Sequence, residues 1–180
     1  CFITVAPREI IPVQAVNMPT FFVHIAVAPT KNMDRMEWFV EKATEIGIDA
    51  ISCLNCRFSE RREIKPARLE KILVSAMKQS QKATLPQLEG MVDFKDFVQR
   101  PFEGRKFIAH CEEGEKPLLR QLYHPRERAL ILIGPEGDFS PEEIALAKAN
   151  GFEAISLGES RLRTETAALV ACHTLHVLNQ

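Results

Sequence analysis

The chain contains 180 residues, of which 46% are hydrophobic and 26% charged, and it carries a formal net charge of −1. These values predict one soluble globular domain, with room for a small appendage. They exclude a transmembrane helix, because no run of about 18 apolar residues occurs, and no segment resembles a signal peptide.

After residue 20, the hydrophobic pattern predicts alternating strands and helices. The predicted strands comprise residues 21–27, 49–54, 106–111, 130–133 and 154–157. The predicted helices comprise residues 34–46, 66–82, 93–98, 116–123 and 141–150, and a last helix capped by Thr164. This alternation indicates an α/β fold with a mainly parallel sheet flanked by helices.

Basic residues are concentrated between Arg57 and Lys82. Eight Lys and Arg residues stand there against three Glu residues, a local charge of +5 that leaves −6 for the rest of the chain. In a generic protein, an ordinary solvated loop and helix face would explain such a segment. The segment would also attract phosphates through counterion release. Base stacking is not expected, because aromatic residues do not alternate with the basic ones.

Residues 130–151 form the first of two units in which a glycine-containing loop joins a strand to a helix. The strand at 130–133 stops at the sequence GPEGDF, residues 134–139. We expect its two glycines to adopt backbone conformations closed to other residues. Ser140 is expected to cap the following helix, and Glu143 completes a capping box with it.

The second unit repeats this plan. A strand at 154–157 leads into a loop at 158–163, and Thr164 is a candidate cap for a helix of small and apolar residues. This helix is expected to be buried, either within the chain or against another subunit.

Neither loop carries a familiar nucleotide-binding fingerprint. The sequences G-x-G-x-x-G and G-x-x-x-x-G-K-[ST] are both absent, which excludes the dinucleotide-binding and P-loop motifs. Taken alone, the spacing Gly134-x-x-Gly137 is explained by a tight turn at least as well as by a ligand site.

The combination of motifs is more specific than either loop. GPEG at 134–137, the capped helix and LGxxxLRTETA at 157–167 resemble the signature of the RsmE family. These are bacterial methyltransferases of the SPOUT class, which use S-adenosylmethionine to methylate N3 of a uridine in 16S ribosomal RNA. The segment DRMExxxxKATEIG at 34–47 and the residues Gln79-Ser80 near Leu85-Pro86 also resemble family motifs.

Two positions depart from the family pattern. Asp138 stands where the family usually has a second glycine, and Lys82 stands where it usually has an arginine. The first departure affects the rim of the expected cofactor pocket, and the second affects one expected RNA contact.

The resemblance implies an architecture as well as an activity. Residues 21–180 are expected to form a SPOUT methyltransferase domain with a C-terminal trefoil knot. Residues 1 to about 20, which begin at Cys1 and contain three prolines, are expected to be the end of a truncated N-terminal PUA-like barrel and its linker. The resemblance also implies a homodimer with the active site between subunits, and the apolar C-terminal helix is the expected contact.

The resemblance places the cofactor among three strand ends. The implied cofactor-binding residues are Ala109, His110, Gly134, Glu136, Gly137, Leu157, Gly158, Leu162, Arg163 and Thr164. Glycine loops suit this role because they expose backbone polar groups at close range. The implied RNA-binding residues are Arg57, Arg61, Arg62, Lys65, Lys82 and Arg161.

Methylation at N3 of uridine requires removal of the imide proton and stabilisation of the negative charge that develops on O2 and O4. Arg161 or Arg163 would supply the positive field, and we favour Arg163 for positioning the substrate or cofactor. Glu136 or Glu165 would accept the proton or orient the base, and both stay open. A helix dipole alone would explain Glu165, and a structural ion pair would explain Arg163.

Other constellations indicate less. Cys53-x-x-Cys56 has no second Cys or His pair at zinc-finger spacing, so no metal is expected. The five scattered cysteines, an odd number, favour a reduced, cytoplasmic protein. The alternative function is a non-catalytic RNA-binding or ribosome-assembly protein that keeps the same fold.

Overall fold

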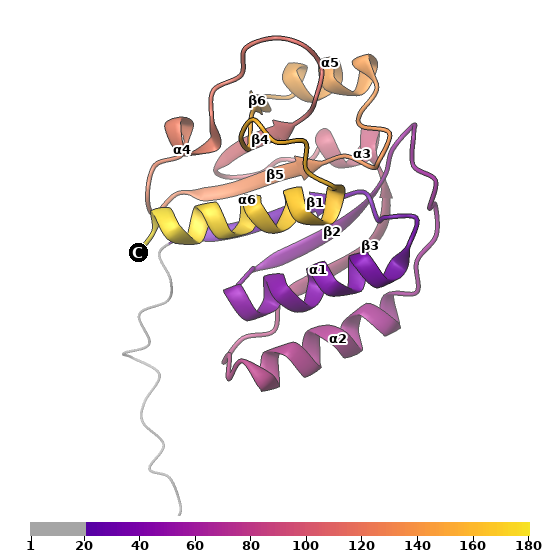
Figure 1. The fold of residues 1–180 in the computed structure, drawn as a ribbon, viewed down its shortest axis with the longest axis vertical. Helices are drawn as coiled ribbons and strands as arrows, with labels where there is room; N and C mark the ends of the chain where they lie inside the picture. Colours follow the sequence, from indigo (N-terminus) through magenta and orange to yellow (C-terminus); the bar gives the residue numbers. More distant parts are fainter. Residues whose placement is uncertain (1–20) are drawn as a thin grey trace, which may run out of the picture.

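A computed structural model describes residues 21–180, which form one six-stranded sheet (Figure 1). All strand pairs are parallel and the strand order is β3-β2-β1-β5-β4-β6. The strands are β1 (Phe22–Val27), β2 (Ala50–Asn55), β3 (Gln87–Asp93), β4 (Arg105–Ala109), β5 (Arg128–Ile133) and β6 (Glu153–Ile155). The predicted α/β fold with a mainly parallel sheet is therefore confirmed. The structural prediction for residues 1 to about 20 lies outside the described residues.

Helices cover both faces of the sheet. They are α1 (Met33–Ile46), α2 (Pro66–Gln79), α3 (Phe94–Val98), α4 (Leu119–Leu122), α5 (Pro141–Ala149) and α6 (Thr164–Leu178). Helices α1, α2 and α6 lie on one face, and α3 and α5 lie on the other (Figure 1). In residues 21–180, no helix is long and apolar enough to cross a membrane.

The central strands supply a core to each face. Val23, Ile25 and Val27 of β1 are buried against the α1, α2 and α6 side, whereas Ala26 belongs to the cluster under α3 and α5. In β5 every residue after Arg128 is buried. Strands buried on both faces have nearly continuous apolar sequences, which explains why these two were readily predicted.

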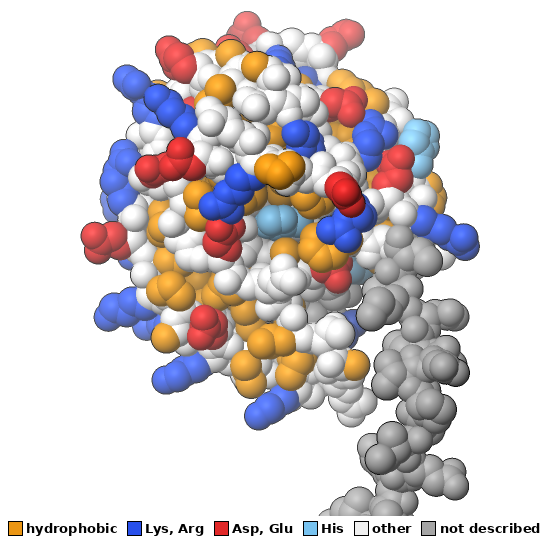
Figure 2. Space-filling model, turned by 180° about the vertical axis from the view of Figure 1, so that it is seen from behind, with side chains coloured by type: hydrophobic (Ala, Val, Ile, Leu, Met, Phe, Trp, Pro, Cys, Tyr) orange, Lys and Arg blue, Asp and Glu red, His pale blue; other side chains and the backbone are white. Residues whose placement is uncertain are grey.

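Figure 2 shows the face that carries α3 and α5. Positive and negative side chains alternate over this face, and neither sign forms a continuous patch there. The basic residues of segment 57–82 therefore form no continuous positive patch on this face of the protein.

Strand β3 was missed by the sequence analysis. It follows Pro86, contains Gly90 and lies at the edge of the sheet, where its side chains are half-buried or exposed. Such a strand lacks the continuous apolar run of a central strand. Two predicted helices are also too long. Helix α2 ends before Gln81, which adopts a φ of 56°, and Leu118 pairs with Ser156 instead of joining α4.

Candidate active site

A cavity of about 1010 Å³ lies beyond the carboxyl ends of β4, β5 and β6. Three segments line it, and they follow those three strands in the fold. Loops beyond the carboxyl ends of parallel strands are the usual ligand site of open α/β sheets. We call residues 134–139 the first cavity loop and residues 156–163 the second cavity loop.

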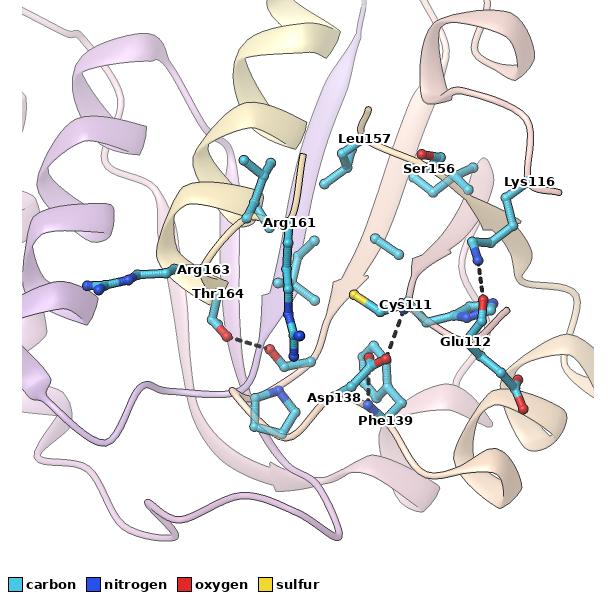
Figure 3. Close-up of a pocket in the computed structure, with 18 of the residues that line it drawn as sticks. Cys111, Glu112, Lys116, Asp138, Phe139, Ser156, Leu157, Arg161, Arg163 and Thr164 are labelled. Carbon is cyan, nitrogen blue, oxygen red and sulfur yellow. Dashed lines mark hydrogen bonds between the residues drawn. The ribbon is translucent and has the colours of Figure 1, made fainter. Parts of the chain in front are cut away.

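The first cavity loop is fixed by hydrogen bonds from Asp138. Its carboxylate oxygens accept from the Cys111 backbone N–H at 2.8 Å and from the Phe139 N–H at 2.8 Å. The Asp138 N–H in turn donates to the Pro135 carbonyl at 2.9 Å. These bonds join the first cavity loop to the end of β4 (Figure 3). The role of Asp138 was not predicted from the sequence.

Backbone strain in this loop falls on Asp138 and not on the glycines. Asp138 has a φ of 64°, whereas neither Gly134 nor Gly137 lies in the left-handed region. The prediction that the glycines supply unusual backbone conformations is therefore wrong. Glycine is needed at both positions because a side chain would meet close neighbours. A Cβ on Gly134 would lie 3.2 Å from the Phe139 ring, and one on Gly137 would lie 3.0 Å from Phe58 Cβ.

The loop leads into α5 through the predicted capping box. The Ser140 N–H donates to Glu143 Oε1 at 2.9 Å, and the Glu143 N–H donates to Ser140 Oγ at 3.2 Å. Ser140 and Glu143 are both buried. The predicted cap is therefore confirmed, and it fixes where the first cavity loop ends.

The second cavity loop is held less firmly. Ser156 Oγ and the Gly158 backbone bond to each other at 3.1 and 3.2 Å, and residues 158–161 are exposed. Gly158 has a φ of 133°, and a Cβ there would meet no atom of the described residues within 4 Å. Arg161 points into the cavity, whereas Arg163 points toward α1 and away from the cavity (Figure 3).

Thr164 ties the two cavity loops together. Its buried hydroxyl donates to the Gly134 carbonyl at 3.0 Å (Figure 3). The predicted role of Thr164 as a helix cap is wrong, because Arg163 occupies the N-cap position and makes no side-chain capping bond. The Thr164 hydroxyl is used for a contact between segments instead.

His110 is a buried polar group at the cavity wall. Its side chain is 9% exposed, and among residues 21–180 neither ring nitrogen has a hydrogen-bond partner. Burial lowers the pKa of His110, and the nearby Lys116 lowers it further. A neutral imidazole offers one donor and one acceptor, so His110 can bind a polar ligand group at this wall.

The two candidate glutamates occupy different surroundings. Glu136 lines the cavity, and its Oε1 accepts from the Lys31 backbone N–H at 2.9 Å. Glu165 is buried but does not line the cavity, and its Oε1 lies 3.9 Å from Arg35 Nε. Its Oε2 has no hydrogen-bond partner within residues 21–180. The structure therefore brings only Glu136 to the cavity wall.

The remaining predicted cofactor-binding residues do come together. Ala109, Gly134, Gly137, Leu157, Gly158, Leu162, Arg163 and Thr164 all line the cavity. Leu157 and Leu162 are half-buried there and supply apolar contact area. The carboxyl ends of three strands thus meet at one cavity, where the family resemblance places the cofactor.

The predicted RNA-binding residues do not form one cluster. Arg61 donates to the carbonyls of Thr30 and Lys31, and Arg62 donates to Asn55 and to the Arg57 carbonyl. These bonds order the loop between β2 and α2. Lys65 occupies the N-cap position of α2 without a side-chain capping bond, whereas Lys82 follows the end of this helix. Lys82 therefore stands at the opposite end of α2 from Lys65, near Gly47 at the end of α1, where a Cβ on Gly47 would lie 3.7 Å from Lys82 Nζ.

Cys53 and Cys56 are two separate thiols in the interior of the domain. Cys53 and Cys56 are buried and free, and burial raises the pKa of both thiols, that of Cys53 to about 12. In the part of the chain that the structure describes, no group of three or more His, Cys, Asp or Glu side chains is placed to hold a metal ion.

The fold and the cavity define an open α/β protein with a ligand-sized cavity at the carboxyl edge of a parallel sheet. The family model for an RNA methyltransferase domain matches residues 17–176, and the chain belongs to that family. The resemblance predicted from the loop motifs is thereby confirmed.

Several proteins of known name are similar in sequence to this chain. The Rickettsia conorii protein called ribosomal RNA small subunit methyltransferase E is 31% identical over 156 residues, which cover 86% of this chain and 64% of that protein. A Mycobacterium tuberculosis protein of the same name is 30% identical over 81% of this chain and 59% of its own length. The chain thus spans less than two thirds of the length of these relatives.

Two solved structures share the fold closely. A probable rRNA-methyltransferase from Porphyromonas gingivalis is 46% identical, with a TM-score of 0.84, over 88% of this chain and 68% of that one. A ribosomal RNA small subunit methyltransferase E from Neisseria gonorrhoeae, bound to S-adenosyl methionine, is 28% identical. Its TM-score is 0.81, over 92% of this chain and 70% of that one.

Proposed function

We propose that this protein transfers a methyl group from S-adenosylmethionine to N3 of a specific uridine in 16S ribosomal RNA of the small subunit. The observation that carries the proposal is the cavity built by the two family motifs, GPEG and LGxxxLRTETA. A relative of the same fold binds S-adenosyl methionine. Ribosomal RNA is a cytoplasmic substrate in bacteria, so we also propose a cytoplasmic protein.

The residues of the cavity fit this cofactor. Its volume lies at the upper end of the range for small-molecule sites, about 300–1,000 Å³. Leu157 and Leu162 supply an apolar slot for a ring, and the glycine backbones supply donors and acceptors. The two ring nitrogens of His110, which have no hydrogen-bond partner within residues 21–180, match a ligand with polar edges. When bound, the cofactor supplies an activated methyl group.

Protein side chains have two tasks in the transfer. They hold the uridine so that N3 faces the methyl group, and they stabilise the charge left after N3 loses its proton. Arg161 points into the cavity and is placed to supply a positive field (Figure 3). Glu136 is the candidate proton acceptor on the cavity wall, although its Oε1 is engaged by Lys31. We therefore propose that its Oε2 performs this role.

Arg163 and Glu165 fit a role at a subunit boundary. Both lie at the start of α6, where Arg163 points toward α1 and Glu165 lies beside Arg35 of α1. We propose a homodimer that packs through α6, in which Arg163 positions the substrate or cofactor near the boundary. Light scattering at micromolar concentration tests this assembly, and a monomer would contradict it.

We also propose that the segment after β6 forms the trefoil knot of SPOUT proteins. In support, the chain leaves the edge strand β6 and returns to the middle of the sheet, where Thr164 bonds to the end of β5 and α6 packs beside α1. Residues 21–180 would then be the methyltransferase domain.

The deciding experiment is methyl transfer by the full-length protein. It would use labelled S-adenosylmethionine and small ribosomal subunits that lack the modification, followed by nucleoside analysis. We expect labelled N3-methyluridine. Label in a different nucleoside would overturn the proposed atom or base.

A non-catalytic RNA-binding or ribosome-assembly protein is the alternative, and Asp138 is the observation that favours it, because it replaces a family glycine at the rim of the cavity. Calorimetric titration with S-adenosylmethionine separates the two functions. Absence of binding would favour the alternative.

A further inference from the structure

Phe58 is a large apolar side chain that is exposed to solvent. It follows β2, and 47% of its surface is exposed. An isolated exposed apolar residue is common on protein surfaces and by itself indicates nothing. The surroundings of Phe58 are what set it apart.

The loop that carries Phe58 is fixed on both sides of the ring. The Cys56 N–H donates to Ser59 Oγ at 3.0 Å, and the Ser59 N–H donates to the Cys56 carbonyl at 3.2 Å. The Arg57 N–H donates to Glu143 Oε2 at 3.2 Å. Ser59 and Glu143 are themselves buried. The exposure of Phe58 is therefore a fixed feature of the fold and not the result of a loose loop.

The position of Phe58 connects it to the cavity. A Cβ on Gly137 would lie 3.0 Å from Phe58 Cβ and 3.8 Å from its Cγ, and Gly137 lines the cavity. The aromatic ring therefore stands against the outer side of the first cavity loop. A molecule that reached the cavity past this loop would meet the ring.

A positive charge lies close to the ring. The Arg57 guanidinium carbon lies 5.9 Å from the ring centroid, and within residues 21–180 Arg57 has no ion-pair partner. Arg61 and Arg62 belong to the same loop. The nearby acid Glu60 is paired with Lys31 at 2.8 Å. A strand of phosphates can thus pass Phe58 without meeting an unpaired Glu60.

We propose that Phe58 is a stacking platform for an unpaired nucleobase next to the methyl-accepting uridine, with Arg57 contacting the adjacent phosphate. The inference rests on the proposed RNA methyltransferase function. A uridine whose N3 enters the cavity must leave its base stack, which exposes the face of a neighbouring base. Aromatic side chains bind such faces without regard to sequence. This revises the expectation that the basic segment does not stack on bases.

The test compares three variants of the full-length protein at this position: Phe58→Ala, Phe58→Leu and Phe58→Tyr. Binding of labelled 16S ribosomal RNA is measured by filter retention, and S-adenosylmethionine binding by calorimetry. We expect Ala and Leu to weaken RNA binding by roughly five- to hundredfold. Tyr should bind like the wild type, and cofactor affinity should be unchanged in all three. Because the side chain is exposed, none of the variants should unfold.

Salt dependence separates stacking from phosphate contact. Phe58→Ala should leave the slope of log affinity against log salt unchanged, whereas Arg57→Ala should reduce its magnitude by about one. Wild-type RNA affinity in Phe58→Ala would overturn the proposal. Wild-type affinity in Phe58→Leu would replace stacking by simple apolar contact. A change from dimer to monomer in Phe58→Ala would identify a subunit contact instead.

The RNA-binding readout does not depend on methyl transfer. If the wild type transfers no methyl group but loses RNA affinity on Phe58→Ala, the platform stands and the proposed reaction fails. If transfer occurs normally in both proteins with equal affinity for RNA, the reaction stands and the platform is rejected.

Discussion

The two cavity loops differ in how firmly the protein holds them. The first is fixed by Asp138 to the end of β4, by Glu136 to Lys31 and by Thr164 to α6. In the second, the Ser156 backbone is bonded to Pro117 and Leu119 at the start of the loop, and Thr164 anchors its end. Between them, within residues 21–180, the loop's side-chain hydrogen bonds join Ser156 and Gly158 to each other. The first loop is therefore built before a ligand arrives, whereas the second can adjust to one. The protein combines a fixed wall with an adaptable one.

The largest expected effect concerns the second cavity loop. Arg163→Ala should reduce methyl transfer by about 100-fold or more while leaving the fold intact, since it removes a positioning charge and no core contact. The matched comparison is Arg161→Ala, which removes the arginine side chain that points into the cavity. The measurements are kcat, cofactor affinity and thermal unfolding. Full activity of Arg163→Ala would remove Arg163 from the mechanism.

Acid should destabilise the fixed parts of the domain. Burial lowers the pKa of His24 in β1 from 6.5 to about 4. Between these values the unfolded chain binds more protons than the folded one, so the free energy of unfolding falls as pH decreases, by up to about 3 kcal/mol. Urea unfolding at several pH values measures this loss. In His24→Gln the loss should be smaller, and an unchanged pH dependence would contradict the assignment.

His110, which follows β4 at the cavity wall, lets a pH titration address the cavity. Its pKa is lowered by burial, so its contribution to stability also declines as pH falls below 6.5. A bound cationic cofactor would disfavour protonation further. We expect cofactor affinity to decrease with acidification in the wild type and in His24→Gln, but less in His110→Gln. Equal pH dependence in the three proteins would argue against contact with His110.

Removal of the Asp138 side chain should loosen the first cavity loop. Asp138→Ala leaves two backbone N–H groups without their acceptors and places alanine at a φ of 64°, for an expected loss of about 2 kcal/mol. Asp138→Asn keeps one acceptor and tolerates this conformation, so its loss should be about half as large. Urea unfolding measures both. Equal stability of the two variants would show that the loop does not depend on the carboxylate.

The smallest expected effects come from the loop glycines. A Cβ on Gly134 would press on the Phe139 ring and backbone at 3.2 Å, and the fixed first loop has no room to yield. Gly158→Ala meets no neighbouring atom in the described residues and adds only backbone strain, about 1 kcal/mol. We expect Gly134→Ala to lower cofactor affinity about tenfold more than Gly158→Ala. The reverse order would contradict the comparison of the two loops.

The sequence predicted the parts of the fold that depend on local patterns. The buried strands β1 and β5 and the Ser140–Glu143 capping box have signals within a few residues, and all three were found. Strand β3 was missed because an edge strand with Gly90 has no such signal. The convergence of three strand ends on one cavity followed from the parallel topology and the family motifs.

The site contacts that were missed join segments far apart in the chain. No local pattern assigns the Thr164 hydroxyl to the Gly134 carbonyl or the Asp138 carboxylate to Cys111. The left-handed backbone of Asp138 could have been predicted from the sequence. Aspartate tolerates a positive φ, and here it replaces a glycine of the family pattern. Phe58 carried no such signal, since its contact with Gly137 exists only after folding.

The hydrogen bond from Thr164 to Gly134 also bears on synthesis of the protein. Gly134 precedes Thr164 by 30 residues, so its carbonyl has no Thr164 donor until the start of α6 has been made. A nascent chain arrested before that helix would present the GPEG motif without the far wall of the cavity. Cofactor capture should therefore begin only after α6 has been synthesised and has packed beside α1.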